Sequence, residues 1–125
     1  MFLTIKGKVK SGYRRGKRIG FPTVNITIPR GLKIKKDQWG IYFSLVKIDG
    51  KTYPGVTHFG PLKTFSLRKK TCETYLLTVR QDLYHQNIEK KLIFKFREVE
   101  KYPTISALKR QIKKDVKAAK NFFGL

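Results

Sequence analysis

The chain has 125 residues, which is the length of one domain with a single buried core. Its hydrophobic content of 40%, with 13% aromatic residues, indicates a globular fold and argues against disorder. No apolar run approaches the roughly 18 residues of a membrane span. A single cysteine, Cys72, excludes an internal disulfide and a cysteine-based metal cluster. We therefore expect a soluble, cytoplasmic protein without a membrane partner.

The net charge of +21 comes from 29 Lys and Arg residues against 8 Asp and Glu residues. Such an excess attracts polyanions, which include nucleic acid, anionic membrane surfaces and phosphorylated small molecules. The basic residues are spread from Lys6 to Lys120 and do not form one block. We therefore favour a lysine-rich background composition over a dedicated nucleic-acid site.

Six segments carry the apolar and polar alternation, or the rich apolar run, that predicts β-strands. They are residues 2–10, 23–28, 40–48, 52–59, 72–79 and 88–96. The Asp49-Gly50 pair predicts a tight hairpin turn, and Pro54 suggests that the strand after it is an edge or bulged strand. In the last segment, one face is expected to hold Ile88, Leu92, Phe94 and Phe96.

The C-terminal segment changes to a helical period over residues 104–123. Its apolar residues recur every three or four positions: Ile105, Leu108, Ile112, Val116, Ala119 and Phe123. Thr104, preceded by Pro103, is the expected N-cap, and Gly124 is the expected stop. We therefore predict a six-stranded, antiparallel, Greek-key-like barrel closed against one C-terminal amphipathic helix.

A basic, glycine-rich stretch precedes the second predicted strand. Its glycines are Gly7, Gly12, Gly16 and Gly20, and its basic residues include Arg14, Arg15, Lys17 and Arg18. Glycines let backbone N–H groups approach phosphate oxygens. The spacing differs from a Walker A loop, since Gly16-Lys17 is followed by Arg18. A phosphate loop and a solvated hairpin connection are both open readings of this stretch.

Glu73 is the acidic residue whose position suggests chemistry. Strand alternation places it on the same face as Tyr75, Leu77 and Val79, which we expect to be the interior. A carboxylate directed into an apolar wall is costly unless it has a task or a partner. Either a general base or a salt bridge to a basic side chain would explain it.

Thr23 and Asn25 lie two residues apart directly after Gly-Phe-Pro. A hydroxyl and an amide carbonyl are hard oxygen ligands that suit Mg²⁺, but neither carries charge. Such a site works if the metal arrives on nucleotide phosphates, which supply the anionic ligands. Otherwise, both residues are ordinary polar residues at the start of a strand.

Several segments of the chain resemble the motifs of a known family. The segment GKRIGFPTVNI resembles the Gly-Arg-x-Leu-Gly-Phe-Pro-Thr-Ala-Asn signature of the riboflavin kinase (flavokinase) family. Further similar segments follow in order: GIYF, YPGVTHFG, KTF, ETYLL, DLY and LKRQIKKDVKAAK. The resemblance implies a six-stranded barrel with a C-terminal helix. It also implies phosphoryl transfer from ATP to the ribityl 5′-hydroxyl of riboflavin, which gives FMN and ADP.

The resemblance also implies roles for individual residues. Thr23 and Asn25 resemble the ligands of the Mg²⁺-nucleotide, and Glu73 resembles the catalytic base. The stretch from Gly12 to Gly20 resembles the flap over the nucleotide. The expected nucleotide-site residues are therefore Gly12, Gly16, Lys17, Gly20, Pro22, Thr23 and Asn25. Pro22 would stiffen the strand entry, and Gly20 would leave room for the phosphates.

The chain departs from the family pattern at His58, Lys63, His85 and Val99, mostly in or near loops expected to shape the flavin side. We expect surface or loop roles for both histidines and a packing role for Cys72. Nothing resembles the His-x-Gly-His motif of an adenylyltransferase domain, so FAD synthesis is not expected from this polypeptide. We expect a monomer that binds riboflavin and ATP and no specific nucleic acid. A non-catalytic flavin- or nucleotide-binding barrel and a basic nucleic-acid-binding barrel are the alternatives.

Overall fold

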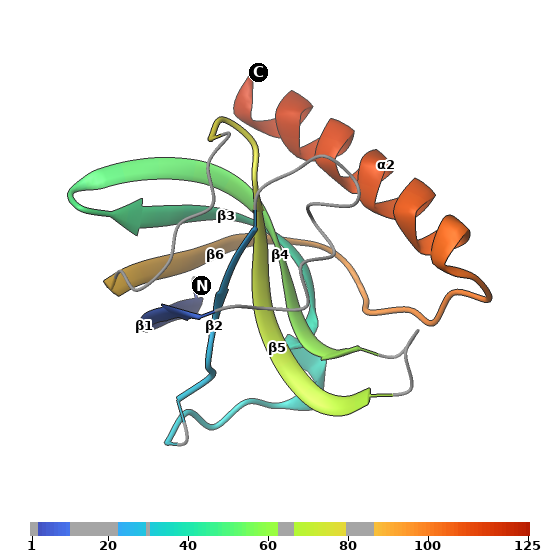
Figure 1. The fold of residues 1–125 in the computed structure, drawn as a ribbon, viewed down its shortest axis with the longest axis horizontal. Helices are drawn as coiled ribbons and strands as arrows, with labels where there is room; N and C mark the ends of the chain where they lie inside the picture. Colours follow the sequence, from blue (N-terminus) through green and yellow to red (C-terminus); the bar gives the residue numbers. More distant parts are fainter. Residues whose placement is uncertain (1–2, 11–22, 30, 63–66, 80–86) are drawn as a thin grey trace.

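The computed structural model describes residues 3–10, 23–29, 31–62, 67–79 and 87–125. Its elements in chain order are β1 (Leu3–Lys10), β2 (Thr23–Ile26), η1 (Lys36–Gln38), β3 (Gly40–Ile48), β4 (Lys51–Leu62), β5 (Leu67–Leu76), β6 (Asn87–Arg97) and α2 (Ile105–Phe123). The strands form a closed antiparallel barrel in the order β1-β2-β5-β4-β3-β6, with α2 lying across its outside (Figure 1). Strands β3, β4 and β5 pair in sequence and β6 returns beside β3, which is a Greek-key arrangement. The predicted fold class is confirmed.

The β3–β4 hairpin forms where the sequence predicts it. Asp49 and Gly50 have φ angles of 50° and 77°, the left-handed values that a type I′ turn requires of both central residues. Of the two alternatives predicted from Pro54, the edge strand is wrong, because β4 lies between β3 and β5 in the closed barrel. Strand β4 does have a register irregularity, but it lies between Pro61 and Leu62 and not at Pro54. Pro54 lies opposite Leu45 of β3, and the β5 register begins one residue later, at Gly55. Gly55 is needed there, since a Cβ atom would lie 2.5 Å from Thr74 Cγ2.

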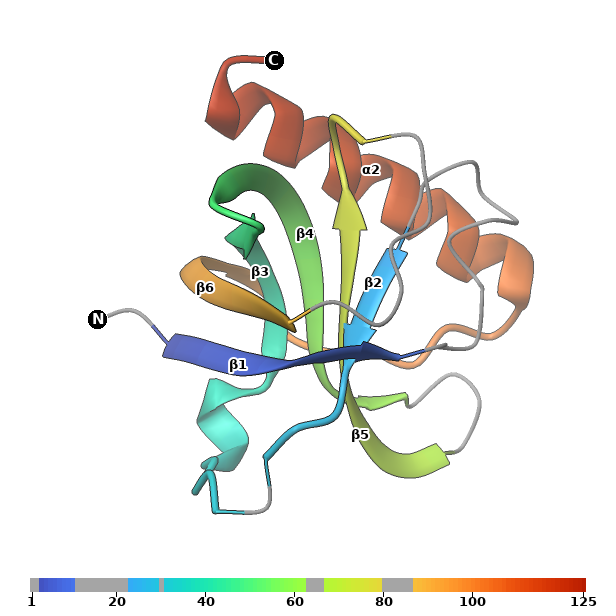
Figure 2. The same ribbon diagram turned by 60° about the vertical axis from the view of Figure 1, so that its left-hand side comes forward.

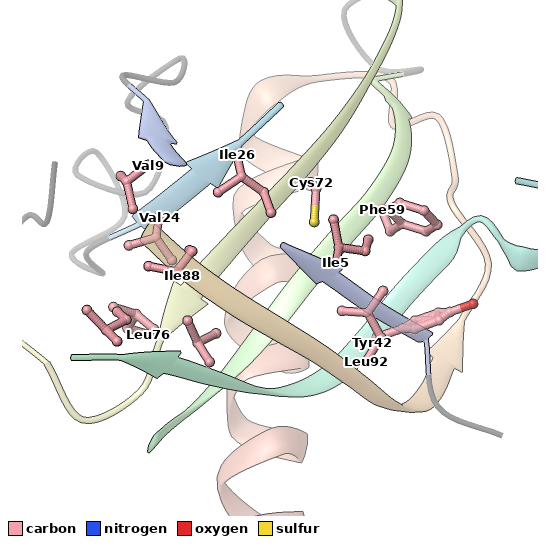
Figure 3. Packing of buried hydrophobic residues seen from close by; sticks show 12 residues of the cluster. Ile5, Val9, Val24, Ile26, Tyr42, Phe59, Cys72, Leu76, Ile88 and Leu92 are labelled. Carbon is pink, nitrogen blue, oxygen red and sulfur yellow. The ribbon is translucent and has the colours of Figure 1, made fainter. Parts of the chain in front are cut away.

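The barrel interior is filled by one apolar cluster to which all six strands contribute. Its buried members are Ile5, Val9, Val24, Ile26, Tyr42, Val46, Ile48, Phe59, Cys72, Leu76, Ile88 and Leu92. Figure 3 shows these side chains converging from opposite walls, with the Cys72 sulfur among them. Cys72 therefore has the packing role that we predicted for it.

Strand β6 changes faces partway along its length. Ile88 and Leu92 point into the barrel, as predicted, but Phe94 stacks on Phe43 outside the barrel at a ring-centroid distance of 5.7 Å. Phe96 stacks on the same ring at 4.8 Å. The prediction that these four residues share a face is wrong, because an irregularity in the β3–β6 register inverts the alternation after Leu92.

Helix α2 packs on the outer face of β3, β4 and β5 through a second apolar cluster. Its buried members are Ile41, Phe43, Val56, Tyr75, Ile112, Val116 and Ala119. The predicted ends of the helix are confirmed: Thr104 accepts a hydrogen bond from the Ala107 N–H, and Gly124 adopts the left-handed conformation. In the described part of the chain, no helix is long and apolar enough to cross a membrane.

Candidate active site

A row of outward-facing residues crosses the barrel beside α2. Asn25 of β2 lies opposite Glu73 of β5, and Glu73 lies opposite His58 of β4. Figure 2 shows β2 and β5 side by side, with α2 passing over the same side of the barrel. Asn25 and Glu73 are only 3% and 4% exposed, although both are polar. The register therefore brings together two of the residues that the sequence singled out.

The direction of Glu73 differs from our prediction. Its neighbours Cys72 and Thr74 are fully buried on the inward face, where the Thr74 hydroxyl lies 2.6 Å from the Thr57 hydroxyl. Alternation along β5 therefore turns Glu73 and Tyr75 to the outer face, where Tyr75 packs in the cluster beneath α2. Glu73 is buried, as expected, but it lies outside the barrel and not inside it. A covered outer wall and an inner wall produce the same apolar pattern in a strand.

Asn25 has the environment expected of a ligand residue. Its Oδ1 atom is buried and has no hydrogen-bond partner among the described residues. A buried amide oxygen without a partner carries a desolvation cost of about 1–3 kcal/mol, which a bound group would relieve. Thr23 lies two residues earlier on the same outer face, opposite Tyr75, and is partly buried. The donor chemistry of these two residues fits Mg²⁺, which prefers oxygen ligands.

A ligand set built only from charged side chains or thiols is absent from the described residues. They contain no group of three or more His, Cys, Asp or Glu side chains that could hold a metal ion. The oxygen atoms of Thr23 and Asn25 would therefore need anionic oxygens from a ligand to complete a coordination shell.

His58 lies in this row within strand β4 and not in a loop, so the loop role predicted for it is wrong; its side chain is partly buried on the outer face. Its Nδ1 atom lies 3.2 Å from the hydroxyl of Thr71, which belongs to the neighbouring strand β5. Burial, together with the positive charge of Arg97, lowers the pKa of His58 to about 4. The imidazole is therefore neutral at neutral pH and adds no charge beside Glu73.

An ion pair between Arg97 and Asp115 connects strand β6 to helix α2. Arg97 of β6, which lies opposite Ile41, donates from Nε to Asp115 Oδ1 at 2.9 Å and from Nη2 to Asp115 Oδ2 at 2.7 Å. Gln111 donates a further bond of 2.9 Å to the same carboxylate. Burial opposes the charge of Arg97, but the hydrogen bonds and charge of Asp115 raise its pKa above the usual value. This pair fixes α2 against the outer face of the barrel.

Several predicted site residues lie outside the described residues: Gly12, Gly16, Lys17, Gly20 and Pro22. Two of the positions that depart from the family pattern, Lys63 and His85, also lie there. The fourth, Val99, is buried. The nucleotide-loop assignment therefore remains a prediction from the sequence.

The sequence reasoning missed one buried cation. Lys90 is 0% exposed, and its ammonium donates hydrogen bonds of 2.7 Å to the carbonyl oxygens of Val24 and Cys72. The available signal was its position between Ile88 and Leu92, since alternation places it on the inward face. A lysine in the middle of an inward-facing apolar run is uncommon, because burying an ammonium is costly unless it is hydrogen-bonded.

The fold and the row define the class of this protein: a closed six-stranded antiparallel barrel domain with a buried polar pair on its outer face, beside a covering C-terminal helix. The Flavokinase family model, described as riboflavin kinase, matches residues 2–123. The chain belongs to the riboflavin kinase family.

Individual proteins support the assignment. The chain is 37% identical over 119 residues to the trifunctional protein RibF/MnmA of Mycoplasmoides gallisepticum, which covers 95% of this chain and 18% of that protein. It is 36% identical over 120 residues to the bifunctional riboflavin kinase/FMN adenylyltransferase of Haemophilus influenzae, which covers 95% of this chain and 38% of that protein. The chain therefore spans well under half the length of these relatives.

Among solved structures, a Streptococcus pneumoniae protein titled macrolide-efflux protein superposes with a TM-score of 0.78 at 25% identity. The superposition covers 95% of this chain and 38% of that one. As with the curated relatives, the similarity concerns one part of a longer chain.

Proposed function

We propose that this chain is an ATP-dependent riboflavin kinase that acts in the cytoplasm. It transfers the γ-phosphoryl group of ATP to the ribityl 5′-hydroxyl of riboflavin and releases FMN and ADP. The observation that carries this proposal is the buried Asn25–Glu73 pair on the outer face of the barrel, in a chain that matches the family over residues 2–123. A carboxylate beside a neutral oxygen ligand supplies two of the functions that phosphoryl transfer requires.

Glu73 is the proposed general base. Its carboxylate accepts the proton of the 5′-hydroxyl while the ribityl oxygen forms its bond to the γ-phosphorus. The bond between that phosphorus and the β,γ-bridging oxygen breaks, and its electron pair leaves with ADP. Because Glu73 is only 4% exposed, few water molecules compete with the substrate hydroxyl for its carboxylate oxygens.

Thr23 and Asn25 are the proposed protein ligands for a Mg²⁺ ion that arrives with the nucleotide. When bound, this ion neutralises phosphate charge. The two side chains contribute a hydroxyl and an amide oxygen from one short strand, and the Asn25 oxygen lacks a competing hydrogen bond in the described residues. Their neutrality is consistent with a metal whose anionic ligands are phosphate oxygens.

His58 is the proposed neutral neighbour of the base. An imidazolium at this position would stabilise the Glu73 carboxylate and weaken it as a proton acceptor. The lowered pKa of His58 avoids this effect at neutral pH. The remaining proposed contacts with the nucleotide come from Gly12, Gly16, Lys17, Gly20 and Pro22.

The direct test is an incubation of the purified chain with riboflavin, ATP and Mg²⁺, read by chromatography for FMN. We expect FMN to form only when all three are present, with one ADP per FMN. Parallel reactions with EDTA in excess over Mg²⁺, and with the Glu73→Gln variant, are the controls. Absence of FMN would overturn the proposal.

The same experiment separates the two alternatives. A non-catalytic barrel would bind riboflavin or nucleotide in calorimetry and form no FMN. A nucleic-acid-binding barrel would bind an oligonucleotide sequence-selectively in both 50 and 200 mM salt. We expect only non-specific binding that weakens steeply over about this range, because it depends on counterion release.

A further inference from the structure

Lys90 is a buried titratable group that the proposed chemistry does not use. It projects from β6 into the barrel, and β6 is hydrogen-bonded to β1 and β3. Its two acceptors lie on neither neighbour: Val24 belongs to β2 and Cys72 to β5. In the closed order of strands, β5 is directly opposite β6. The side chain therefore crosses the barrel and ties β6 to the wall that carries the candidate site.

The two acceptors have specific positions relative to the site. The Val24 carbonyl belongs to the peptide group that leads into Asn25, and the Cys72 carbonyl belongs to the peptide group that leads into Glu73. Asn25 and Glu73 are themselves opposite each other in the β2–β5 register. One ammonium thus holds, from inside the barrel, the backbone of both residues whose side chains lie outside it.

Strand β2 is short and lies between β1 and β5. It has four residues, and among the residues that the structure describes two pairs join it to β1, Val9 with Ile26 and Lys10 with Asn25. On the other side, four pairs join it to β5. The internal bond to Val24 adds a third contact to this short strand, directly before Asn25 in the chain. The charge of a buried ammonium also makes its hydrogen bonds stronger than those between neutral groups.

From this geometry we infer that Lys90 is a positioning residue: its ammonium fixes the Val24–Asn25 and Cys72–Glu73 peptide groups relative to each other, and so sets the placement of the Asn25 amide against the Glu73 carboxylate. The inference rests on the proposed function of these two side chains. Burial lowers the pKa of Lys90, and electrostatic interactions with Cys72 and Glu73 oppose this shift. A small displacement of reacting groups costs about 10²-fold in rate, so the contact is relevant to catalysis.

The test compares Lys90→Met with Ile48→Ala. Methionine keeps the length and apolar stem of lysine without its hydrogen bonds. Ile48 belongs to the same core but to the β3 end of the β3–β4 hairpin, so its variant controls for a general loss of core stability. The two are compared at temperatures equally far below their melting points. Steady-state kinetics and amide hydrogen exchange are measured for both.

We expect Lys90→Met to reduce kcat by about 10- to 100-fold while the KM for riboflavin changes less than about twofold. Amides of residues 23–26 and 72–75 should exchange faster than in Ile48→Ala, while those of residues 42–47 should not. Equal kcat and equal exchange in the two variants would overturn the inference. Faster local exchange with unchanged kcat would also overturn it, because the bonds would then be structural only.

Two further results keep this test separate from the proposed function. If the wild-type chain makes no FMN, the proposed function fails, and the exchange comparison still decides whether Lys90 fixes the two peptide groups. If Lys90→Met does not fold, nitrogen-15 NMR of the wild-type lysine side chains replaces it. One ammonium with slowly exchanging protons and contacts to β2 and β5 supports the inference, and rapid exchange at every lysine overturns it.

Discussion

Residues 24–26 of β2 and 71–76 of β5 are buried on both faces of their strands, and the two faces differ in chemistry. The inner face presents Val24, Ile26 and Cys72 to an apolar core, where the Lys90 ammonium donates two hydrogen bonds to backbone carbonyls. The outer face presents Asn25 and Glu73, which are as buried as core residues but polar. The Asn25 amide oxygen has no hydrogen-bond partner among the described residues. Burial alone therefore does not distinguish the inner face of these two strands from the outer face; the unpartnered Asn25 oxygen does.

The largest expected effect is on kcat, and it comes from removing the charge of Glu73 on the outer face. Glu73→Gln should reduce kcat by about 10²–10⁴-fold, because the amide cannot accept the hydroxyl proton. Binding of the Mg²⁺-nucleotide, measured by calorimetry, should change little, since Asn25 and Thr23 remain. A variant with near wild-type turnover would remove Glu73 from the role of base.

The next effect separates a structural polar pair from the proposed catalytic one. Asp115→Ala should lower the free energy of unfolding by about 3–5 kcal/mol, because it leaves the Arg97 guanidinium without its buried partner. The matched control is Glu98→Ala, which breaks the exposed Lys95–Glu98 pair and should cost less than about 1 kcal/mol. Urea denaturation measures both. Similar losses in the two variants would show that the Arg97–Asp115 pair contributes no more to the free energy of unfolding than a surface pair does.

A smaller effect is expected from the neutral ligand residue. Asn25→Ala should weaken nucleotide binding about tenfold in Mg²⁺, or about 1.4 kcal/mol, and by much less in EDTA. Asn87→Ala, an exposed amide on β6, is the control and should leave both affinities unchanged. Equal losses of affinity for Asn25→Ala in Mg²⁺ and in EDTA would indicate a folding role.

The smallest effect concerns pH. The pKa of His58 is lowered to about 4 in the folded chain, against an ordinary value of 6.5, so the unfolded state binds more protons between these values. The neutral imidazole therefore stabilises the fold fully above about pH 6.5, and this stabilisation is lost as the pH falls toward 4. Between pH 7 and 5.5, the wild-type chain should lose about 1 kcal/mol more stability than His58→Asn. Parallel urea titrations of the two proteins at each pH measure the difference, and equal losses would contradict the shifted pKa.

The elements with local signals were predicted well. Strand β3 and helix α2 have the predicted bounds, since Asp49-Gly50, Thr104 and Gly124 act through their own backbone geometry and hydrogen bonds. Strand β5 begins and ends earlier in the chain than the predicted segment 72–79. Its Leu67–Leu76 range is set by pairing with β2 and β4 and not by its own composition. The face change in β6 was missed for a similar reason: it arises from its register with β3.

The sequence by itself determined that six strands form an antiparallel barrel, where the C-terminal helix begins and ends, and which residues are proposed for catalysis. The tertiary structure alone decided which wall Glu73 faces, that Asn25 and His58 lie on either side of it, and that Lys90 is fully buried. Strand alternation has a period of two and distinguishes two faces, but it does not say which face is inside when both are covered. That choice depends on barrel closure and on where α2 packs, and both are contacts between residues far apart in the chain.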